Sequence, residues 1–444
     1  MLQNYFKLAL KVLARRKFFT FISLFGISFT LMILMLIAAF LENELGNNAP
    51  LSKKDQMIFI PRLIMTLEVI DTVPTVDSTL LDGIMRYDTT YEYVDRRPSF
   101  SSSSVSFPFL DKHMRSLDGA QRESFYSTGN TFDLFINSNK LSFSAIYADA
   151  NYWSIYDFNF REGRPFQAQQ VENQEQVIVL TEKAARSYFG KTTGVVGEIL
   201  KLDNKSYEVV GVVKTPETNR STVGADVFLP YTHVNPRSLN TEEFQGGFQG
   251  VYLSSNKAGL KRIKAEIARR AGQITLPDPE NYNTLNPVAM TFMERYAQGV
   301  LYKEDPSKSV RMVFGLVTGL LLLFVLLPTL NLVNVNISRI IERSSEIGVR
   351  KAFGAHSGNI LFQFVFENIV LTFLGGIIGF VLALVLINII NDSNVLGEVN
   401  LGFNFIVFIY SLLICLFFGI VSGLIPAYRM SKIHIADALK QNQA

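Results

Sequence analysis

Four long stretches of this chain carry no charged residue, and they restrict its fold more than any other feature. They are Phe18–Leu41, Met312–Ser338, Asn368–Asn391 and Val399–Tyr428, with 24, 27, 24 and 30 residues. About 20 apolar residues in a helix span the hydrocarbon core of a bilayer, and a charge at the centre would cost about 3 kcal/mol. The sequence therefore predicts a membrane protein with four transmembrane α-helices.

The composition agrees with this class. Hydrophobic residues make up 48% of the 444 residues and charged residues only 18%. The net charge of +3 comes from local basic groups, which argues against nucleic-acid binding. The single cysteine, Cys415, lies inside an apolar run, so an intrachain disulfide and a zinc site built on two cysteines are excluded.

Lysine and arginine flank the apolar runs unevenly. Five of them precede the first run, four lie between the second and third, and three follow the fourth, whereas 392–402 contains none. Cytoplasmic flanks of membrane helices are enriched in basic residues. We therefore expect both termini and the segment after the second run in the cytoplasm, and the long insert after the first run outside.

The order of segments follows from these runs and flanks. Residues 1–17 are predicted as a cytoplasmic amphipathic helix, with Lys7, Lys11 and Arg15 on one face. The predicted spans are 18–41, 311–338, 359–391 and 403–425. Between and after them come the extracytoplasmic domain 42–310, a cytoplasmic segment 339–358, a short external loop 392–402 and a cytoplasmic tail 426–444.

The insert at 42–310 differs in composition, because charged residues, Asn, Ser and Thr return and apolar runs shorten. Its pattern mixes strands with helices, which predicts a large α+β domain with two subdomains between the first and second spans. Strands are predicted at 140–148, 176–180, 225–232 and 250–255, a hairpin at 198–214 turning at 203–205, and helices at 181–190 and 258–272. Ser101–Ser104 is predicted as an exposed loop.

Motifs for chemistry are absent or incomplete in the sequence. The nearest approach to a phosphate-binding loop is Ala185–Thr192, which has Ala in place of the first Gly and lies where a helix is predicted to end. The four histidines show no metal-ligand spacing, and no G-x-S-x-G surrounds a serine. We therefore predict no catalytic residue, no metal site and no enzyme activity in this chain.

Small residues inside the apolar runs suggest where helices pack. Glycines recur four residues apart, which places each pair on one helix face and favours close approach of a neighbour. The pairs are Gly315 and Gly319, Gly375 and Gly379, Gly419 and Gly423. Membrane helices also tolerate glycine without such a role, so any single pair leaves this alternative open. Glu367, near the start of the third span, is either a functional intramembrane acid or one that reaches the headgroups.

The segment Ile337–Gly358 carries an ordered pattern of charges between two apolar runs. Two serines before Glu346 can cap a helix, in which Glu346 pairs with Arg350 four residues later. Ile347 and Phe353 supply apolar anchors among these charges. Both features favour a helix that docks in the groove of a partner protein over a solvent-exposed loop, which is the alternative.

Several segments of the sequence resemble those of a known family. "ERSSEIGVRKAFGA" (Glu342–Ala355) looks like the cytoplasmic coupling segment of the MacB/FtsX-type ABC transporter permeases. "LARRKFFTFISLFGIS" (Leu13–Ser28) is similar to the entry of the family's first span, and "YWSIYDFNFREGRPF" (Tyr152–Phe166) to its periplasmic core domain. "FVFENIVLTFLGGIIG" (Phe364–Gly379) resembles the third span and "IPAYRMSKIHIADALK" (Ile425–Lys440) the C-terminal signature.

The resemblance implies a permease that dimerises, with a second copy or a paralogue, and binds a separate cytoplasmic ABC ATPase. That ATPase would hold ATP and magnesium, and this chain would hold no cofactor. The resemblance assigns ATPase coupling to Glu342, Arg343, Glu346, Ile347, Gly348, Arg350, Lys351, Phe353 and Gly354.

The family mechanism is mechanotransmission, in which ATPase closure moves the spans and the outer domain. The resemblance implies the bacterial inner membrane as the location and a periplasmic adaptor as a further partner. It also implies peptide or drug export, or lipoprotein release, as the task. The size of the insert favours these two tasks over the alternative task of an FtsX-like regulator of envelope hydrolases. An anchored extracytoplasmic receptor or scaffold without ATP coupling is the alternative from another class.

Overall fold

The computed structural model describes residues 2–15, 17–67, 73–81, 84–92, 99–136, 139–216, 223–279, 281–301, 305–342, 349, 353, 356–393 and 401–431. The chain divides into two compact units. Met1–Gly46 and Arg311–Ala444 form the first, which we call the helical unit, and Asn47–Val310 form the second, the sheet unit.

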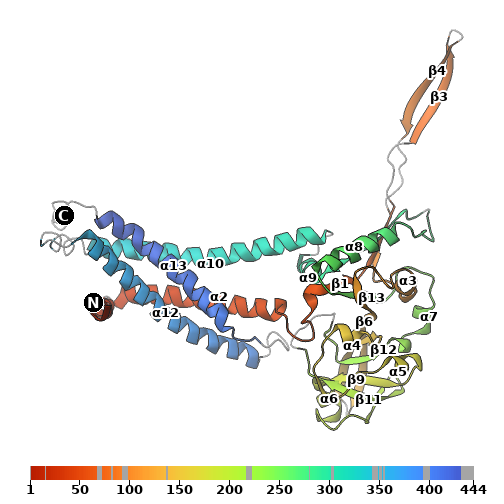
Figure 1. Cartoon of the computed structure of the whole chain (residues 1–444), viewed down its shortest axis with the longest axis horizontal. Helices are drawn as coiled ribbons and strands as arrows, with labels where there is room; N and C mark the ends of the chain where they lie inside the picture. The colour runs from red at the N-terminus through yellow and green to blue at the C-terminus, as the bar shows by residue number, and fades with distance from the viewer. Residues whose placement is uncertain are drawn as a thin grey trace. The chain divides into compact units, whose positions relative to one another are not determined.

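The helical unit is built from long apolar helices. Its elements are α1 (Leu2–Arg15), α2 (Lys17–Leu45), α10 (Pro306–Glu342, which starts at the end of the sheet unit), α12 (Ser357–Ser393) and α13 (Phe405–Ser431). Helix α12 packs against α2 and α13, and these three lie side by side in Figure 1. A helix forms over most of the predicted range as α1, and its Ala9 and Leu13 are buried against Val370 and Leu371 of α12. The cytoplasmic location of this helix stays a prediction.

Three helices in the described residues are long and apolar enough to cross a membrane: Lys17–Leu45, Pro306–Leu326 and Leu361–Ser393. A fourth apolar stretch, Phe405–Val421, is shorter. The count of four spans therefore stays a prediction. Each of the first three helices is long enough to span a hydrocarbon core of about 30 Å.

The sheet unit is organised around one ten-stranded mixed sheet, with the path β10-β11-β9-β12-β7-β6-β13-β1-β15 and β8 paired to β11. Its strands are β1 (Met57–Ile60), β6 (Ala120–Ile136), β7 (Asn139–Ala148), β8 (Phe160–Gly163), β9 (Val177–Thr181), β10 (Ile199–Leu202), β11 (Lys205–Val213), β12 (Val227–Pro230), β13 (Phe248–Ser254) and β15 (Met290–Thr291). Strand β9 runs parallel to β11, and β7 runs parallel to β12. The α+β class predicted for the insert is confirmed.

Smaller elements complete the sheet unit. A three-stranded sheet joins β14 (Thr284–Pro287), β2 (Leu63–Thr66) and β5 (Phe100–Ser103), and a hairpin joins β3 (Val73–Leu81) to β4 (Ile84–Glu92). The helices are α3 (Phe107–His113), α4 (Tyr152–Ile155), α5 (Ala168–Glu172), α6 (Glu182–Phe189), α7 (Pro236–Leu239), α8 (Lys257–Ala271) and α9 (Phe292–Leu301), with the short 3₁₀ turns η1 (Lys54–Gln56) and η2 (Tyr231–His233).

The local signals in the sequence produced the expected elements. Thr181 caps α6 by accepting a hydrogen bond from the amide of Ala184, and Gly190 ends the helix in the left-handed region at φ 72°. The β10–β11 hairpin turns at Asp203 and Asn204, whose φ angles are 49° and 61°. Short polar side chains tolerate this conformation, which a hairpin turn requires. The predicted strands and helices of the insert are therefore confirmed.

The loop predicted at Ser101–Ser104 is wrong. Ser101 to Ser103 belong to β5, which pairs with β2 in antiparallel register from Leu63↔Ser103 to Thr66↔Phe100. The Ser101 hydroxyl also donates to Oε1 of Gln245 at 2.8 Å. Pairing with distant residues fixes the strand here, and a serine run carries no local sign of it.

Two hydrophobic clusters lie along the large sheet. One is centred on β9, β11, β12 and α6 and includes Ile178, Val209 and Leu229. The other is centred on β1, β13, α3 and α8 and includes Phe125 and Ile263. The two clusters share one continuous sheet within a single compact unit, so the division of the insert into two subdomains stays a prediction.

Candidate functional site

Most of the predicted coupling segment lies outside the described residues, namely Arg343, Glu346, Ile347, Gly348, Arg350, Lys351 and Gly354. Glu342 is the last residue of α10. Val349 and Phe353 are described, and the Phe353 amide donates to the Val349 carbonyl at 3.1 Å. This spacing of four residues is that of one α-helical turn.

The two apolar side chains of this turn are exposed. Val349 is 46% exposed and Phe353 is 89% exposed. Covering a phenylalanine that is now in water would gain roughly 2 kcal/mol. The turn can therefore serve as an apolar anchor for a partner, and its role in docking stays a prediction.

Two of the predicted packing glycines lie where α12 meets α2. A Cβ at Gly375 would lie 2.7 Å from Cγ2 of Ile27, and one at Gly379 would lie 2.7 Å from the carbonyl oxygen of Ser28. Real Cβ atoms do not approach other atoms so closely, so no larger residue fits without moving α2. At Gly419 the nearest atom is Oγ1 of Thr372, at 2.8 Å, where α13 meets α12.

The other glycine pair of the second span has no such neighbour. A Cβ at Gly315 or Gly319 would meet no atom of the described residues within 4 Å. Both lie on α10, where Leu316, Leu320 and other apolar side chains are exposed. Gly423 lies in α13, outside the residues whose surroundings the structure describes.

Polar side chains are buried inside the helical unit. Glu367 is only 2% exposed, and Nε2 of Gln363 donates to its Oε1 at 3.0 Å. Asn368 and Thr372 on the same helix are also buried. The Glu367 carboxylate therefore contacts protein atoms inside the helical unit. Of the two alternatives for this residue, such a contact is expected for an acid that faces inward and not for one that reaches the headgroups.

His233 and the incomplete phosphate loop have ordinary structural surroundings, and His434 lies outside the described residues. Nε2 of His233 lies 2.9 Å from the Glu175 carbonyl oxygen, and burial lowers the pKa of this histidine. Gly190 and Lys191 follow the end of α6, so they do not form the strand-to-helix turn that a phosphate loop needs. Among the described residues, no group of three or more His, Cys, Asp or Glu is placed to hold a metal ion.

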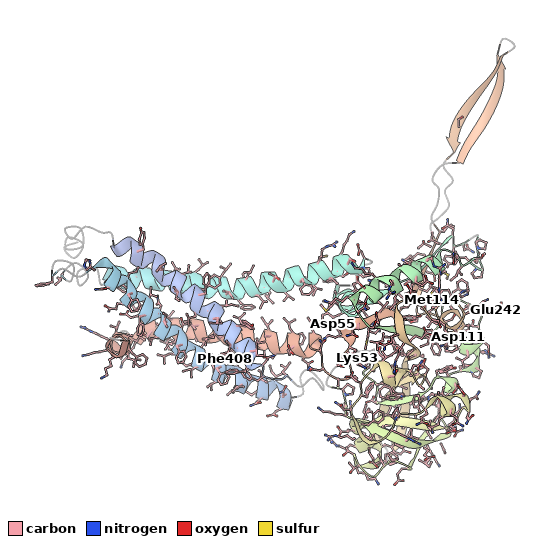
Figure 2. The ribbon with its side chains drawn as sticks, viewed as in Figure 1. Lys53, Asp55, Asp111, Met114, Glu242 and Phe408 are labelled. Atoms are coloured by element: carbon pink, nitrogen blue, oxygen red, sulfur yellow. The ribbon has the colours of Figure 1, made fainter. Side chains whose placement is uncertain are left out.

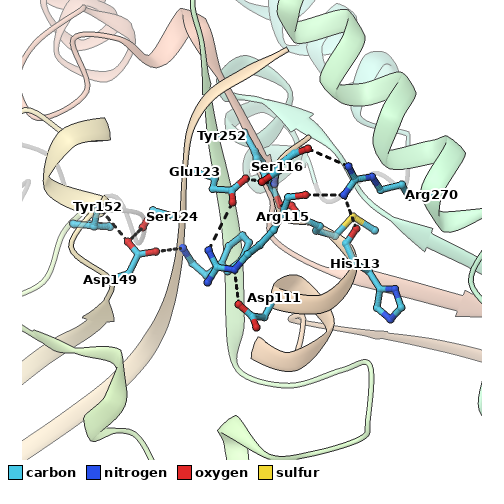
Figure 3. Close-up of polar contacts among 12 residues, drawn as sticks. Asp111, His113, Arg115, Ser116, Glu123, Ser124, Asp149, Tyr152, Tyr252 and Arg270 are labelled. Carbon is cyan, nitrogen blue, oxygen red and sulfur yellow. Dashed lines mark hydrogen bonds and ion pairs between the residues drawn. The ribbon is translucent and has the colours of Figure 1, made fainter. Parts of the chain in front are cut away.

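A polar network in the sheet unit was not predicted from the sequence. Figure 3 shows Arg270 of α8 donating to three backbone carbonyls at and after the end of α3, those of His113, Arg115 and Ser116, at 3.1, 2.7 and 3.1 Å. Nε of the same arginine donates to Glu266 at 2.8 Å. The guanidinium thereby fixes the turn after α3 to α8.

The same network reaches the buried carboxylate of Asp149. It accepts hydrogen bonds from the Ser124 hydroxyl at 2.6 Å and from the amides of Phe125 and Tyr152, each at 3.1 Å (Figure 3). Burial raises the pKa of Asp149 to about 6, although these bonds and the charge of Arg115 favour the ionised form. The donors come from β6 and from the start of α4, and Asp149 directly follows β7, so the arrangement is that of a structural joint between β6, β7 and α4.

Comparisons with known proteins identify the family. The family model described as "MacB-like periplasmic core domain" matches residues 20–270, and the one described as "FtsX-like permease C-terminal" matches residues 318–435. The chain belongs to the MacB/FtsX-type ABC transporter permeases. As a member of this family it is a membrane protein with an extracytoplasmic domain, and the sheet unit contains most of the MacB-like core.

Curated relatives share about a quarter of the aligned residues with this chain. The macrolide export ATP-binding/permease protein MacB of Salmonella typhi is 25% identical over 308 residues, and that of Escherichia coli K12 is 25% identical over 307. These matches cover 69% and 68% of this chain, and the chain spans 44% of each relative's length.

Two solved structures are similar at 13% identity. A domain of a permease protein from Porphyromonas gingivalis has a TM-score of 0.37, with 54% of this chain and 92% of that chain covered. The periplasmic region of MacB from Actinobacillus actinomycetemcomitans has a TM-score of 0.34, with 56% of this chain and 94% of that chain covered.

Proposed function

We propose that this chain is the permease subunit of an ABC transporter and couples ATP hydrolysis by a separate cytoplasmic ATPase to movement of the sheet unit. One observation carries the proposal: a single chain holds a MacB-like core followed by an FtsX-like permease region. No phosphate-binding loop occurs in its 444 residues, so ATP and magnesium would be bound by the partner.

The sidedness that this function needs is supported by the basic flanks. With four spans, both termini and residues 339–358 lie in the cytoplasm of a bacterial cell, and the sheet unit lies on the other side of the inner membrane. Three helices meet the length requirement, and α13 would supply the fourth.

The segment from Glu342 to Gly354 would dock on the ATPase. Its acids and bases suit a charged rim, and the exposed Phe353 suits an apolar pocket at the centre of the contact. Because α10 leads into this segment and α12 follows it, a push on the segment would act on two helices at once.

The packing of the helical unit supports transmission of such a push. At Gly375 and Gly379, helix α12 packs against α2 so closely that no space remains between them for an added Cβ. The two helices would therefore move together. Helix α2 leads directly into the sheet unit, whose Arg270 and Asp149 joints resist deformation. Movement of the helices would therefore displace the outer domain as a body, to export a peptide or drug or to release a lipoprotein.

Helix α10 provides the surface for a second permease copy or a paralogue. An added Cβ at Gly315 or Gly319 meets no described residue of this chain within 4 Å, and apolar side chains around them are exposed. Close approach of a second helix at such a small-residue face is a common mode of assembly in membranes.

The test is a double charge reversal in the docking segment, Glu346→Arg with Arg350→Glu, in the full chain co-expressed with candidate ATPases. We expect the wild type to co-purify with an ATPase and the double variant to lose most of it, since like charges then face the partner's rim. The matched control reverses an exposed pair in the sheet unit, Asp133→Lys with Lys140→Asp, and should keep the ATPase.

Unchanged ATPase binding and ATP-driven transport in the docking variant would refute the assignment of this segment. If the wild type itself captures no ATPase from its native membrane, the chain is an anchored scaffold and the proposed coupling is wrong.

A further inference from the structure

The sheet unit contains an open groove of about 480 Å³ to which the proposed function assigns no role. It lies between η1, the first two turns of α8 and the start of α9, and we call it the lysine groove. Asp55, on its rim, is labelled in Figure 2. Four lysines from two elements line it: Lys54, Lys257, Lys261 and Lys264.

The lysine groove carries an excess of positive charge. Lys257, Lys261 and Lys264 follow at i, i+4 and i+7 on one face of α8. Lys264 pairs with Glu294 at 2.5 Å, which offsets its charge. Lys257 and Lys261 are exposed and form no ion pair within the described part of the chain.

Opposing charge at the groove is small. Asp55 is the one acid among the lining residues, and its carboxylate accepts a weak hydrogen bond from Asn47 at 3.5 Å. On the inner side, Lys54 is only 2% exposed, and its ammonium lies 5.2 Å from the ring centroid of Phe292. The groove therefore holds a field that attracts an anion, with two lysines able to contact it.

The floor of the groove is apolar. Leu260 of α8 and Phe292 and Met293 of α9 line it together with the lysines. A bare anion such as phosphate gains nothing from such a floor, whereas a molecule with an anionic head and an apolar body gains from both parts. The lining thus favours an anionic amphiphile.

The chain connections bring the groove within reach of a membrane. Eight residues, 46–53, separate Leu45, the end of α2, from Lys54, and an extended chain spans at most about 3.5 Å per residue. On the other side, α9 ends at Leu301 and the apolar α10 begins at Pro306. Both connections to the membrane helices therefore leave from elements that line the groove.

We propose that the lysine groove binds the headgroup of an anionic phospholipid from the adjoining leaflet. The phosphate contacts Lys257 and Lys261, and the first part of the acyl chains lies on Leu260 and Met293. Such a contact would tie the sheet unit to the membrane surface next to both of its connections, and it does not depend on the identity of the ATPase.

The experiment uses the full chain in a neutral detergent, with an environment-sensitive fluorophore on Met293→Cys in a Cys415→Ala background. Phosphatidylglycerol is titrated in, with phosphatidylcholine of the same acyl chains as the uncharged comparison. We expect a saturable fluorescence change with phosphatidylglycerol only. In Lys257→Gln with Lys261→Gln the half-saturating lipid fraction should rise about 30-fold, since each basic side chain near an anionic lipid contributes about a fivefold factor.

Two control variants test whether the effect is specific to the positive charge of the lysine groove. Lys201→Gln with Lys205→Gln removes two exposed lysines elsewhere on the sheet unit and should leave the titration unchanged. Lys257→Arg with Lys261→Arg keeps the charge and should retain binding. The unfolding midpoint, followed by Trp153 fluorescence, checks that each variant is folded.

Three results would overturn the proposal. The first is an equal response to phosphatidylcholine, and the second is an unchanged titration in the Lys257→Gln, Lys261→Gln variant. The third is the same fluorescence change with soluble glycerol phosphate at equal concentration, which would make the ligand a soluble phosphate compound rather than a lipid.

Discussion

The two units place polar and apolar side chains in opposite ways. In the sheet unit, large apolar side chains such as Phe125, Phe248 and Ile263 are fully buried. In the helical unit, Phe21, Phe25 and other phenylalanines form an exposed, partly stacked row along α2. The buried polar side chains of the helical unit lie between its helices: Ser23, Ser28, Thr30, Gln363, Glu367, Asn368, Thr372 and Ser411.

The difference shows that the same residue types are sorted against two solvents. In water, burial of apolar surface drives the fold, so the sheet unit has conventional cores. In a membrane, apolar side chains lose nothing by facing outwards, and helices associate through small residues and interhelical polar contacts. The single tryptophan, Trp153, lies in the sheet unit and the single cysteine, Cys415, in the helical unit, so each unit has its own natural reporter.

The largest contrast is expected for one residue type placed in both units. Phe248→Ala should lower the free energy of unfolding of the sheet unit by about 3–5 kcal/mol, because it empties a fully buried site. Phe25→Ala, at a position 59% exposed, should change the stability of the helical unit by less than about 1 kcal/mol. Thermal unfolding followed by Trp153 fluorescence and by Cys415 thiol reactivity measures both. Equal losses of stability in the two units would contradict the proposed difference between them.

The next effect concerns the glycines. Gly379→Leu should destabilise the helical unit by about 3 kcal/mol, because even a Cβ there meets the backbone of Ser28. Gly402→Leu, at an exposed loop position of the same unit where an added Cβ meets no described atom within 4 Å, should leave the thermal midpoint of Cys415 reactivity unchanged. If the two variants behave alike, close packing of α12 on α2 does not hold the helical unit together.

A third prediction uses the buried carboxylate of Asp149, whose pKa is about 6 in the folded state against an ordinary 3.8. The folded state therefore retains the proton to higher pH than the unfolded state, and stability falls as pH rises. The expected loss is about 1.4 kcal/mol between pH 5 and pH 7.5, and Asp149→Asn should remove it. Trp153 fluorescence in denaturant titrations at both pH values measures the change.

Other groups titrate in the same window, and the comparison of wild type with Asp149→Asn cancels them. Burial lowers the pKa of His113 and His233, which makes stability rise with pH up to about 6.5. Burial raises the pKa of Glu123, which acts in the direction of Asp149. An identical pH dependence in wild type and variant would show that Asp149 has no raised pKa.

The smallest effect should be the same in both units, because helix capping satisfies backbone donors in either setting. Thr181→Ala removes the cap of α6 and should cost the sheet unit about 1 kcal/mol. Asn404→Ala removes the acceptor of the Ile406 and Val407 amides at the start of α13 and should cost the helical unit a similar amount. If the substitution lowers the stability of only one unit, the contribution of helix capping depends on the surrounding solvent.

Sequence alone predicted the features that local chemistry determines. The cap and stop of α6, the turn at Asp203 and Asn204 and the apolar lengths of α2 and α12 each depend on a few neighbouring residues. The family was recognised from short motifs such as Glu342–Ala355, and the comparisons confirm it.

Features set by distant residues could not be predicted in this way. The joint between Arg270 and the His113 carbonyl links positions 157 residues apart, and strand β5 exists because β2 lies beside it. The glycine spacing did not tell which pair meets a neighbour, because that depends on how helices are arranged. The lysine groove likewise joins residues of η1, α8 and α9 that are far apart in the sequence.

The central claim is that the sheet unit and the coupling segment lie on opposite sides of one membrane. The direct test labels single cysteines at Asp203→Cys, in the exposed β10–β11 turn, and at His356→Cys, just before α12, in a Cys415→Ala background. An impermeant maleimide added to cells with an opened outer membrane should label position 203 at once and position 356 only after lysis. Labelling of both positions before lysis would contradict the proposed coupling of a cytoplasmic ATPase to an outer domain.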